Sequence, residues 1–160
     1  MKKNEFERKF LCYKLPDFLS FVNVSLITQY YLPDGRRFRV VSDAITKAVK
    51  DYQFIKKVRK DKGFNTEVIF NVDIKKSREI LKECLKNKYL NITKERYLHI
   101  TTQGLLFEFD VFKKLNNLTV LEVETKNFGD EIIIDKMIQD YIICEVTDKE
   151  EFSNINLARL

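Results

Sequence analysis

The sequence predicts an α+β fold, in which helices pack against an antiparallel sheet with one apolar and one charged face. The first observation is the stretch Glu5-Phe6-Glu7-Arg8-Lys9-Phe10, because successive side chains of a strand point to opposite faces. The second is that the same alternation recurs four times further along the chain. The third is a helical apolar stripe within residues 74–90. The charged faces indicate either a flat sheet with one wet side or a sheet rolled up with its charges inside.

The four recurrences share one form, in which two like charges stand two residues apart and so share a face of the strand. The pairs are Arg37 and Arg39, Lys94 and Arg96, Glu108 and Asp110, and Glu122 and Glu124. Two of these strands therefore carry only bases on the charged face, and two carry only acids.

The composition is that of one domain spanning residues 1–160, since 44% of the residues are hydrophobic and only four Gly and two Pro are present. No apolar run is long enough for a membrane span or a signal core, so a cytoplasmic protein is expected. Three cysteines, Cys12, Cys84 and Cys144, are far apart and are expected to be buried free thiols. His99 is the only histidine, which excludes zinc sites built on several histidines.

The net charge of +5 is compatible with nucleic acid as a partner, but its distribution argues against this. The 24 acids are interleaved with the 29 bases, and much of the lysine excess lies on the solvent side of the helix expected within residues 74–90. Dedicated nucleic-acid binding is therefore not expected, and any metal chemistry must rest on carboxylates, which suit Mg²⁺ or Mn²⁺.

The remaining elements are predicted from turn signals and periodicity. Short helices are expected at 16–22 and 155–160, and a second amphipathic helix at 130–141 with Ile133, Ile134, Met137, Ile138 and Tyr141 inward. Ser153 or Asn154 is expected to cap the last helix or to serve the site. Residues 42–51 fit either a helix or a strand connection. Strands are expected at 26–32, 52–59 and 66–72, the first joined to the Arg37 strand by a Pro33-Asp34-Gly35 hairpin turn.

The charged strands, taken in order, resemble the signature of the CYTH superfamily, also called the triphosphate tunnel metalloenzymes. Six segments carry this resemblance over nearly all of the chain. They are Glu5-x-Glu7-x-Lys9, Arg37-x-Arg39, Ile92-x-Lys94-x-Arg96-Tyr97, Phe107-Glu108-Phe109-Asp110-Val111-Phe112, Leu121-Glu122-Val123-Glu124, and Glu145-Val146-Thr147-Asp148 with Phe152-Ser153-Asn154. The resemblance implies an antiparallel barrel of about eight strands whose inward charges line a tunnel and whose apolar outer wall is covered by helices.

The resemblance also implies roles for these charges. Phosphate would be bound by Lys9, Arg37, Arg39, Lys94, Arg96 and one of Lys56 and Lys57, whose strand register the sequence leaves open. One Mg²⁺ or Mn²⁺ would be held by Glu5, Glu7, Glu122 and Glu124, with Glu108 beside them, and a second ion near Asp110 and Glu67 would activate water. Lys9 would stabilise the leaving phosphate. Ile69 stands where the family often has a further acid, which puts the second ion in doubt.

The function implied is metal-dependent hydrolysis of a linear triphosphate, with inorganic tripolyphosphate as the favoured substrate. Thiamine triphosphatase, nucleoside or RNA 5′-triphosphatase and class IV-type adenylate cyclase are alternatives, since all share the tunnel. A module that binds polyphosphate or a nucleotide without turnover is a further alternative. The expected partner is a small molecule that contains a triphosphate; membranes are not expected, and a homodimer is left open.

Overall fold

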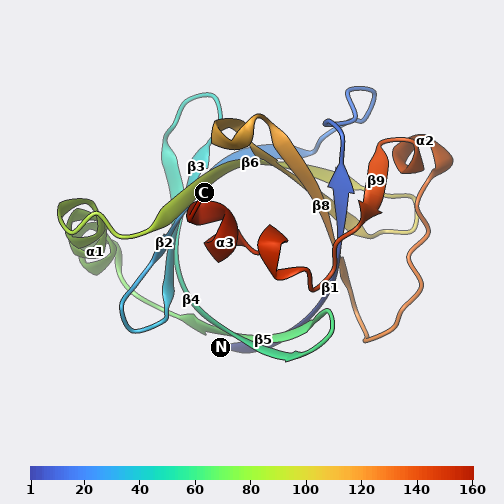
Figure 1. Cartoon of the computed structure of the whole chain (residues 1–160). Coiled ribbons are helices and arrows are strands. Elements are labelled where there is room, and N and C mark those ends of the chain that lie inside the picture. Colours follow the sequence, from blue (N-terminus) through green and yellow to red (C-terminus); the bar gives the residue numbers. More distant parts are fainter.

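The computed structural model describes residues 1–160 and shows nine antiparallel strands, eight of which close into a barrel (Figure 1). The strands are β1 Lys2–Cys12, β2 Asn23–Tyr31, β3 Arg37–Asp43, β4 Val49–Asp61, β5 Phe64–Phe70, β6 Asn91–Ile100, β7 Leu106–Phe112, β8 Leu118–Thr125 and β9 Ile142–Glu145. The helices are α1 Ile74–Lys86, α2 Lys136–Gln139 and α3 Asn154–Ala158, with single 3₁₀ turns η1 Lys113–Leu115 and η2 Glu150–Phe152. None of the helices is long and apolar enough to cross a membrane.

The barrel closes at β1, which is shared among three neighbours. The strand order is β5-β4-β3-β2-β6-β7-β8-β1, and β1 then pairs back to β5. One edge of β1 pairs with β8. The other edge pairs with β5 over Lys2–Phe6 and with β9 over Phe10–Cys12. The predicted closed antiparallel barrel is therefore confirmed, and β9 adds a ninth strand outside the closed ring.

The outer wall of the barrel carries two apolar cores. Phe38, Val40 and Phe54 on β3 and β4 pack against Cys84 of α1. On another part of the wall, a larger cluster with Phe109 at its centre is covered by the segments around residues 15–21 and 132–142. Figure 1 shows α1 and α2 outside the ring on different sides of it. The apolar strand faces thus point outward, as the sequence predicts, and the charged faces point inward.

A third apolar cluster lies inside one end of the barrel. Inward residues Ile92, Phe112 and Val120 pack against Leu157 of α3, and all four are less than a tenth exposed. Figure 1 shows α3 within the outline of the strand ring. The C-terminal helix therefore fills one end of the interior with apolar side chains. Ser153 caps it, since its Oγ accepts from the backbone N–H of Asn156, which confirms the predicted cap.

Helix predictions were right where a polar cap and an apolar stripe coincide. The helix expected at 74–90 is α1, which Asp73 caps by accepting from the backbone N–H of Lys76. The helix expected at 16–22 is absent, and these residues form turns and bends. Residues 42–51 form the β3–β4 hairpin, in which Asp43 accepts from the backbone N–H groups of the next turn.

The helix expected at 130–141 is reduced to the single turn of α2, and the prediction of its inward face was wrong in part. Ile132 and Ile134 pack on the outer wall while Ile133 between them is 63% exposed, which is the period of an extended chain. Three consecutive β-branched residues favour that conformation over a helix. Met137 is also exposed, whereas Ile138 is buried. Cys144 was expected to be buried and is exposed.

Candidate functional site

The interior of the barrel holds a cavity of about 360 Å³, and nearly all of its lining is polar or charged. The charged lining residues from the strands are Lys3, Glu5, Glu7, Lys9, Arg37, Arg39, Lys57, Arg59, Glu67, Lys94, Arg96, Glu108, Glu122 and Glu124. They lie there because alternate residues of each strand point inward. The charged faces recognised in the sequence therefore converge on one space inside the barrel.

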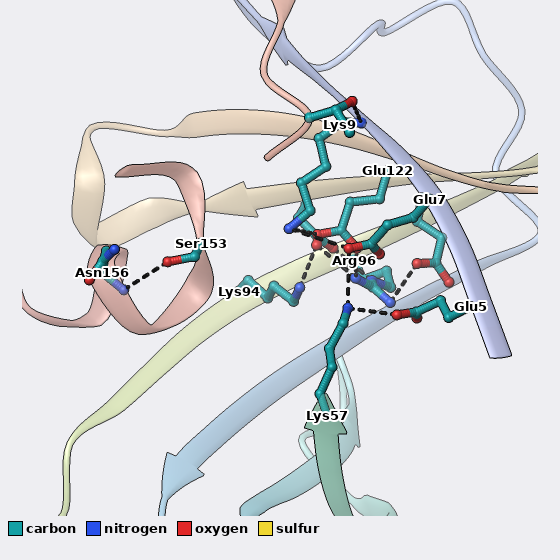
Figure 2. A network of polar contacts seen from close by, with 12 residues as sticks. Glu5, Glu7, Lys9, Lys57, Lys94, Arg96, Glu122, Ser153 and Asn156 are labelled. Atoms are coloured by element: carbon teal, nitrogen blue, oxygen red, sulfur yellow. Dashed lines mark hydrogen bonds and ion pairs between the residues drawn. The ribbon is translucent and has the colours of Figure 1, made fainter. Parts of the chain in front are cut away.

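One wall of the cavity, made by β1 and β8, concentrates carboxylates. Glu7 lies directly opposite Glu124 in the ladder, and Lys9 lies opposite Glu122. Like charges in direct cross-strand pairs repel one another, so cations must compensate them. Lys57 of β4 reaches across to them, with its Nζ 2.6 Å from Glu5 Oε2 and 3.1 Å from Glu7 Oε1 (Figure 2).

Lys9 and Lys3 complete this compensation. Lys9 Nζ lies 3.2 Å from Glu122 Oε1 and 3.9 Å from Glu7 Oε1. Lys3 Nζ lies 2.6 Å from Glu124 Oε1 near the more exposed part of the wall. Each carboxylate of the β1 and β8 wall is therefore held by a lysine.

The network also shifts pKa values. Burial, together with the nearby Glu122, raises the pKa of Glu7. Burial alone would raise the pKa of Glu122, but Lys9 and the other cations around it hold the pKa well below its ordinary value. Burial alone would lower the pKa of Lys9, and Glu122 and Glu7 outweigh it, so that pKa is raised. Lys9 and Glu122 are thus a charged pair, with Glu7 the more readily protonated acid.

A second ionic cluster lies deeper, around Asp110 of β7. Arg96 donates from Nε to Asp110 Oδ1 at 2.7 Å and from Nη2 to Oδ2 at 2.8 Å, and Lys94 donates to the same Oδ2. Arg96 also contacts Glu108 at 2.6 Å and Glu122 at 3.1 Å. Asp110 is completely buried, which makes its two cations necessary partners.

Burial also shifts the pKa values of the residues in this cluster. It raises the pKa of Glu108 to about 7, although the charge of Arg96 acts against the shift, and the nearby acids Glu122 and Asp110 add to it. Burial and the adjacent Arg96 lower the pKa of Lys94. The carboxylates Asp110, Glu108 and Glu122, in contrast, hold the pKa of Arg96 well above its ordinary value.

The wall of the cavity made by β3 differs from the β1 and β8 wall in its charge balance, because its two arginines are not paired with carboxylates. Neither Arg37 nor Arg39 forms an ion pair with a carboxylate. Arg39 instead donates to two amide oxygens, those of Gln29 on β2 and Gln53 on β4. Burial and the charge of Arg96 lower the pKa of Arg39, and the carboxylates of Glu67 and Glu122 offset this shift only in part. This wall is a ready site for an anion.

The carboxylates of the β1 and β8 wall have the chemistry that a hard divalent cation requires, but they are not grouped around one point. Glu5, Glu7, Glu122 and Glu124 offer oxygen ligands on the inward faces of two adjacent strands. In the structure no three acidic side chains gather around a common point, because lysines occupy the positions between them. Mg²⁺ or Mn²⁺ could be held there once these lysines turned to another anion.

The structure resolves which lysine of β4 is inward. Lys57 lines the cavity, whereas Lys56 is exposed on the outer side, so the inclusion of Lys56 among the phosphate-binding candidates was wrong. The other predicted basic residues, Lys9, Arg37, Arg39, Lys94 and Arg96, do line the cavity.

The proposed second metal position is not favoured by the structure. Both oxygens of Asp110 are taken by Lys94 and Arg96, and Glu67 on β5 shares no ion-pair partner with it. Glu67 instead lies between Lys3 and Lys57 in the ladders of β1 and β4. Asp110 therefore acts in this structure as the counter-ion of two buried bases.

Sequence reasoning missed several residues that line or support the cavity, and Lys3, Tyr31 and Gln29 are three of them. Lys3 pairs with Glu124, Tyr31 lines the cavity, and Gln29 holds Arg39. All three continue the inward alternation of strands that had already been recognised, at Lys3-x-Glu5 and Gln29-x-Tyr31. Extending the alternation by one step would have found them.

The closed eight-stranded antiparallel barrel with a charged interior is the architecture that the resemblance to the triphosphate tunnel metalloenzymes implied. Among solved structures the chain is similar to the crystal structure of the inorganic triphosphatase NE1496, with a TM-score of 0.59 and 25% identity over 96% of this chain and 97% of that one. A second crystal structure of NE1496 gives a TM-score of 0.55 at the same identity and coverage. No protein-family model and no curated protein matches the sequence.

Proposed function

We propose that this protein is a metal-dependent hydrolase of a linear triphosphate and that inorganic tripolyphosphate is its substrate. The observation that carries the proposal is the division of the cavity into two walls. Arg37 and Arg39 lack acidic partners on one side, and paired carboxylates stand on β1 and β8 on the other. A polyanion bridged to those carboxylates by a cation satisfies both walls at once. The similarity to an inorganic triphosphatase along nearly the whole chain supports the reaction class.

In the proposed reaction the basic residues bind the triphosphate and the acidic residues bind the metal ion. Arg37 and Arg39 bind phosphoryl oxygens, which a guanidinium can do with two parallel hydrogen bonds. Lys57 and Lys9 turn from carboxylates to the phosphates as the anion enters, which frees Glu5, Glu7 and Glu122. Mg²⁺ or Mn²⁺ bound to these acids would supply charge neutralisation and a more acidic water. Lys9, whose pKa is raised, stays protonated and can stabilise the leaving phosphate.

The apolar cluster at one end of the barrel, here called the apolar plug, favours a small substrate. Ile92, Phe112, Val120 and Leu157 fill one end of the barrel, so the cavity lies beside a packed core at that end. An ester group attached to the triphosphate would have to displace these packed apolar side chains to enter that end. This favours inorganic tripolyphosphate over a nucleotide whose base and sugar need their own pocket.

The direct test is phosphate release from tripolyphosphate, ATP and thiamine triphosphate, each with Mg²⁺, with Mn²⁺ and with a chelator, together with a search for cyclic AMP. Tripolyphosphate is expected to be hydrolysed fastest, and only with a metal. Formation of cyclic AMP, or a folded protein that hydrolyses none of the three substrates with either metal, would contradict the proposal.

A matched pair of variants tests the β3 wall. Arg37 faces the cavity, whereas its neighbour Arg36 pairs with Asp34 at 2.7 Å and lies over Phe54 and Phe70 on the outer side. Arg37→Gln is expected to weaken tripolyphosphate binding by about 10-fold or more, because hydrogen bonds to charged groups contribute about 1.5–3 kcal/mol. Arg36→Gln should leave binding unchanged. Equal effects of the two substitutions would show that the anion is not bound inside the barrel.

A further inference from the structure

Three side chains on β2 and β3 form a chain of hydrogen bonds that ends in the cavity. Arg39 donates to Gln29 Oε1 from Nη2 at 3.0 Å and from Nε at 3.2 Å. Gln29 in turn donates from Nε2 to the hydroxyl oxygen of Tyr31 at 2.8 Å. Gln29 is only 1% exposed, so bulk water does not compete for its hydrogen bonds with Arg39 and Tyr31. The chain therefore runs Arg39, Gln29, Tyr31 inside the protein.

The direction of this chain is fixed by chemistry at its first member. A guanidinium has only donors, so the atom of Gln29 that faces Arg39 must be its oxygen. The amide nitrogen of Gln29 must then face Tyr31, and the Tyr31 oxygen must accept. The hydroxyl proton of Tyr31 cannot be used toward Gln29, and the structure gives it no other acceptor.

The free proton is next to the unpaired cation of the β3 wall. Tyr31 lies directly opposite Arg37 in the β2–β3 ladder, as Gln29 lies opposite Arg39. Both Tyr31 and Arg37 line the cavity. Burial raises the pKa of Tyr31 even though Arg37 acts against it, so the hydroxyl keeps its proton at neutral pH. A hydrogen-bond donor and a cation therefore converge on the same part of the cavity.

We propose that Tyr31 is a ligand-binding residue that donates its hydroxyl hydrogen bond to a phosphoryl oxygen, and that Gln29 is the positioning residue that reserves this proton for the ligand. This inference rests on the proposed function, since it needs an anion beside Arg37. It adds a neutral donor to the cationic contacts, and it explains why an uncharged amide stands between Arg39 and Tyr31. A carboxylate at that position would accept from both neighbours and turn the hydroxyl away from the cavity.

The first experiment measures tripolyphosphate binding by calorimetry in a chelator, so that no turnover interferes. Tyr31→Phe keeps the ring and removes the donor, and it is expected to weaken binding about 10-fold or more. Tyr30→Phe is the matched control, because Tyr30 is the next residue of β2, points to the outer core and forms no side-chain hydrogen bond. It should bind as the unmodified protein does.

The second experiment tests Gln29 by coupling. If Gln29 acts through Tyr31, Tyr31→Phe made on top of Gln29→Glu should change affinity by less than about 2-fold, because the hydroxyl has already been turned away. If the two effects instead add, the positioning role of Gln29 is refuted. The ¹³Cζ resonance of Tyr31 in labelled but otherwise unmodified protein should move when tripolyphosphate is added, which requires no substitution.

The outcomes separate this inference from the function on which it rests. Failure of the unmodified protein to bind tripolyphosphate both in chelator and with Mg²⁺ would overturn the proposed function, and this inference with it. Binding that Tyr31→Phe leaves intact, or a Tyr31 resonance that does not respond to bound tripolyphosphate, would overturn the inference alone.

Discussion

Replacing Asp110 with Asn should strongly destabilise the protein. Asp110 is fully buried and accepts three hydrogen bonds from two cations, two of them from Arg96 at 2.7 and 2.8 Å and one from Lys94. Asn keeps the shape but removes the charge, and it turns an amide N–H₂ toward one of the bases. Removal of one partner of a buried ion pair costs about 3–5 kcal/mol, because the remaining charge stays buried without compensation.

The measurement is urea and thermal unfolding of the unmodified protein and of Asp110→Asn at neutral pH. A loss of about 3–5 kcal/mol corresponds to a decrease of roughly 6–20 °C in Tm for a chain of this length. Glu79→Gln is the control, because Glu79 forms only an exposed pair with Lys76 at 3.6 Å on α1, and such pairs contribute about 0–1 kcal/mol. If Asp110→Asn lost less than about 1 kcal/mol, the Asp110 cluster would not be the buried ionic centre described here.

Two further predictions concern pH and the plug. Burial raises the pKa of Glu108 from 4.5 to about 7, so the folded protein holds this proton more tightly than the unfolded chain. The contribution of Glu108 to the free energy of unfolding should therefore fall by about 3 kcal/mol as pH rises from 4.5 through 7. Glu108→Gln should flatten that part of the profile, and parallel profiles would contradict the assignment. Leu157→Ala should cost about 2–4 kcal/mol, because Leu157 is 4% exposed inside the barrel, whereas Leu160→Ala, at 86% exposure, should cost less than about 0.5 kcal/mol. Similar losses in urea unfolding would show that α3 does not pack as described.

The strand faces could be predicted because alternation is a property of the extended chain itself. Glu5, Glu7 and Lys9 share a face in any strand, whatever surrounds it. Their convergence on one cavity required closure of the sheet, which only the order of the family motifs indicated. The fold was therefore predictable from pattern and resemblance together.

The register of β4 could not be predicted, and the structure shows the physical reason. Phe54 packs outside the barrel and Ile55 points inside, yet they are 1% and 3% exposed. Because both faces bury an apolar residue there, hydrophobicity does not distinguish Lys56 from Lys57. Only the closed barrel, with Glu5 and Glu7 opposite, selects Lys57 as the inward residue.

The sequence also could not predict which charged residues pair with one another inside the barrel. Asp110 is two residues from Glu108 on the same strand face, and the resemblance implied a metal-binding role for each of them. The structure places Asp110 against two bases at full burial, while Glu108 has a single partner, Arg96, and a raised pKa. Such differences depend on depth in the barrel and on the reach of long side chains from other strands.

The sharing of β1 among three strands has a consequence for how the chain acquires its fold. β1 is synthesised before its β8 partner, Leu118–Thr125, which lies more than a hundred residues later in the chain. Until then a nascent chain exposes an edge of β1 that could pair with another molecule. Docking of β5 along Lys2–Phe6 protects only part of that strand, so ring closure is expected to be a late and slow event in biosynthesis.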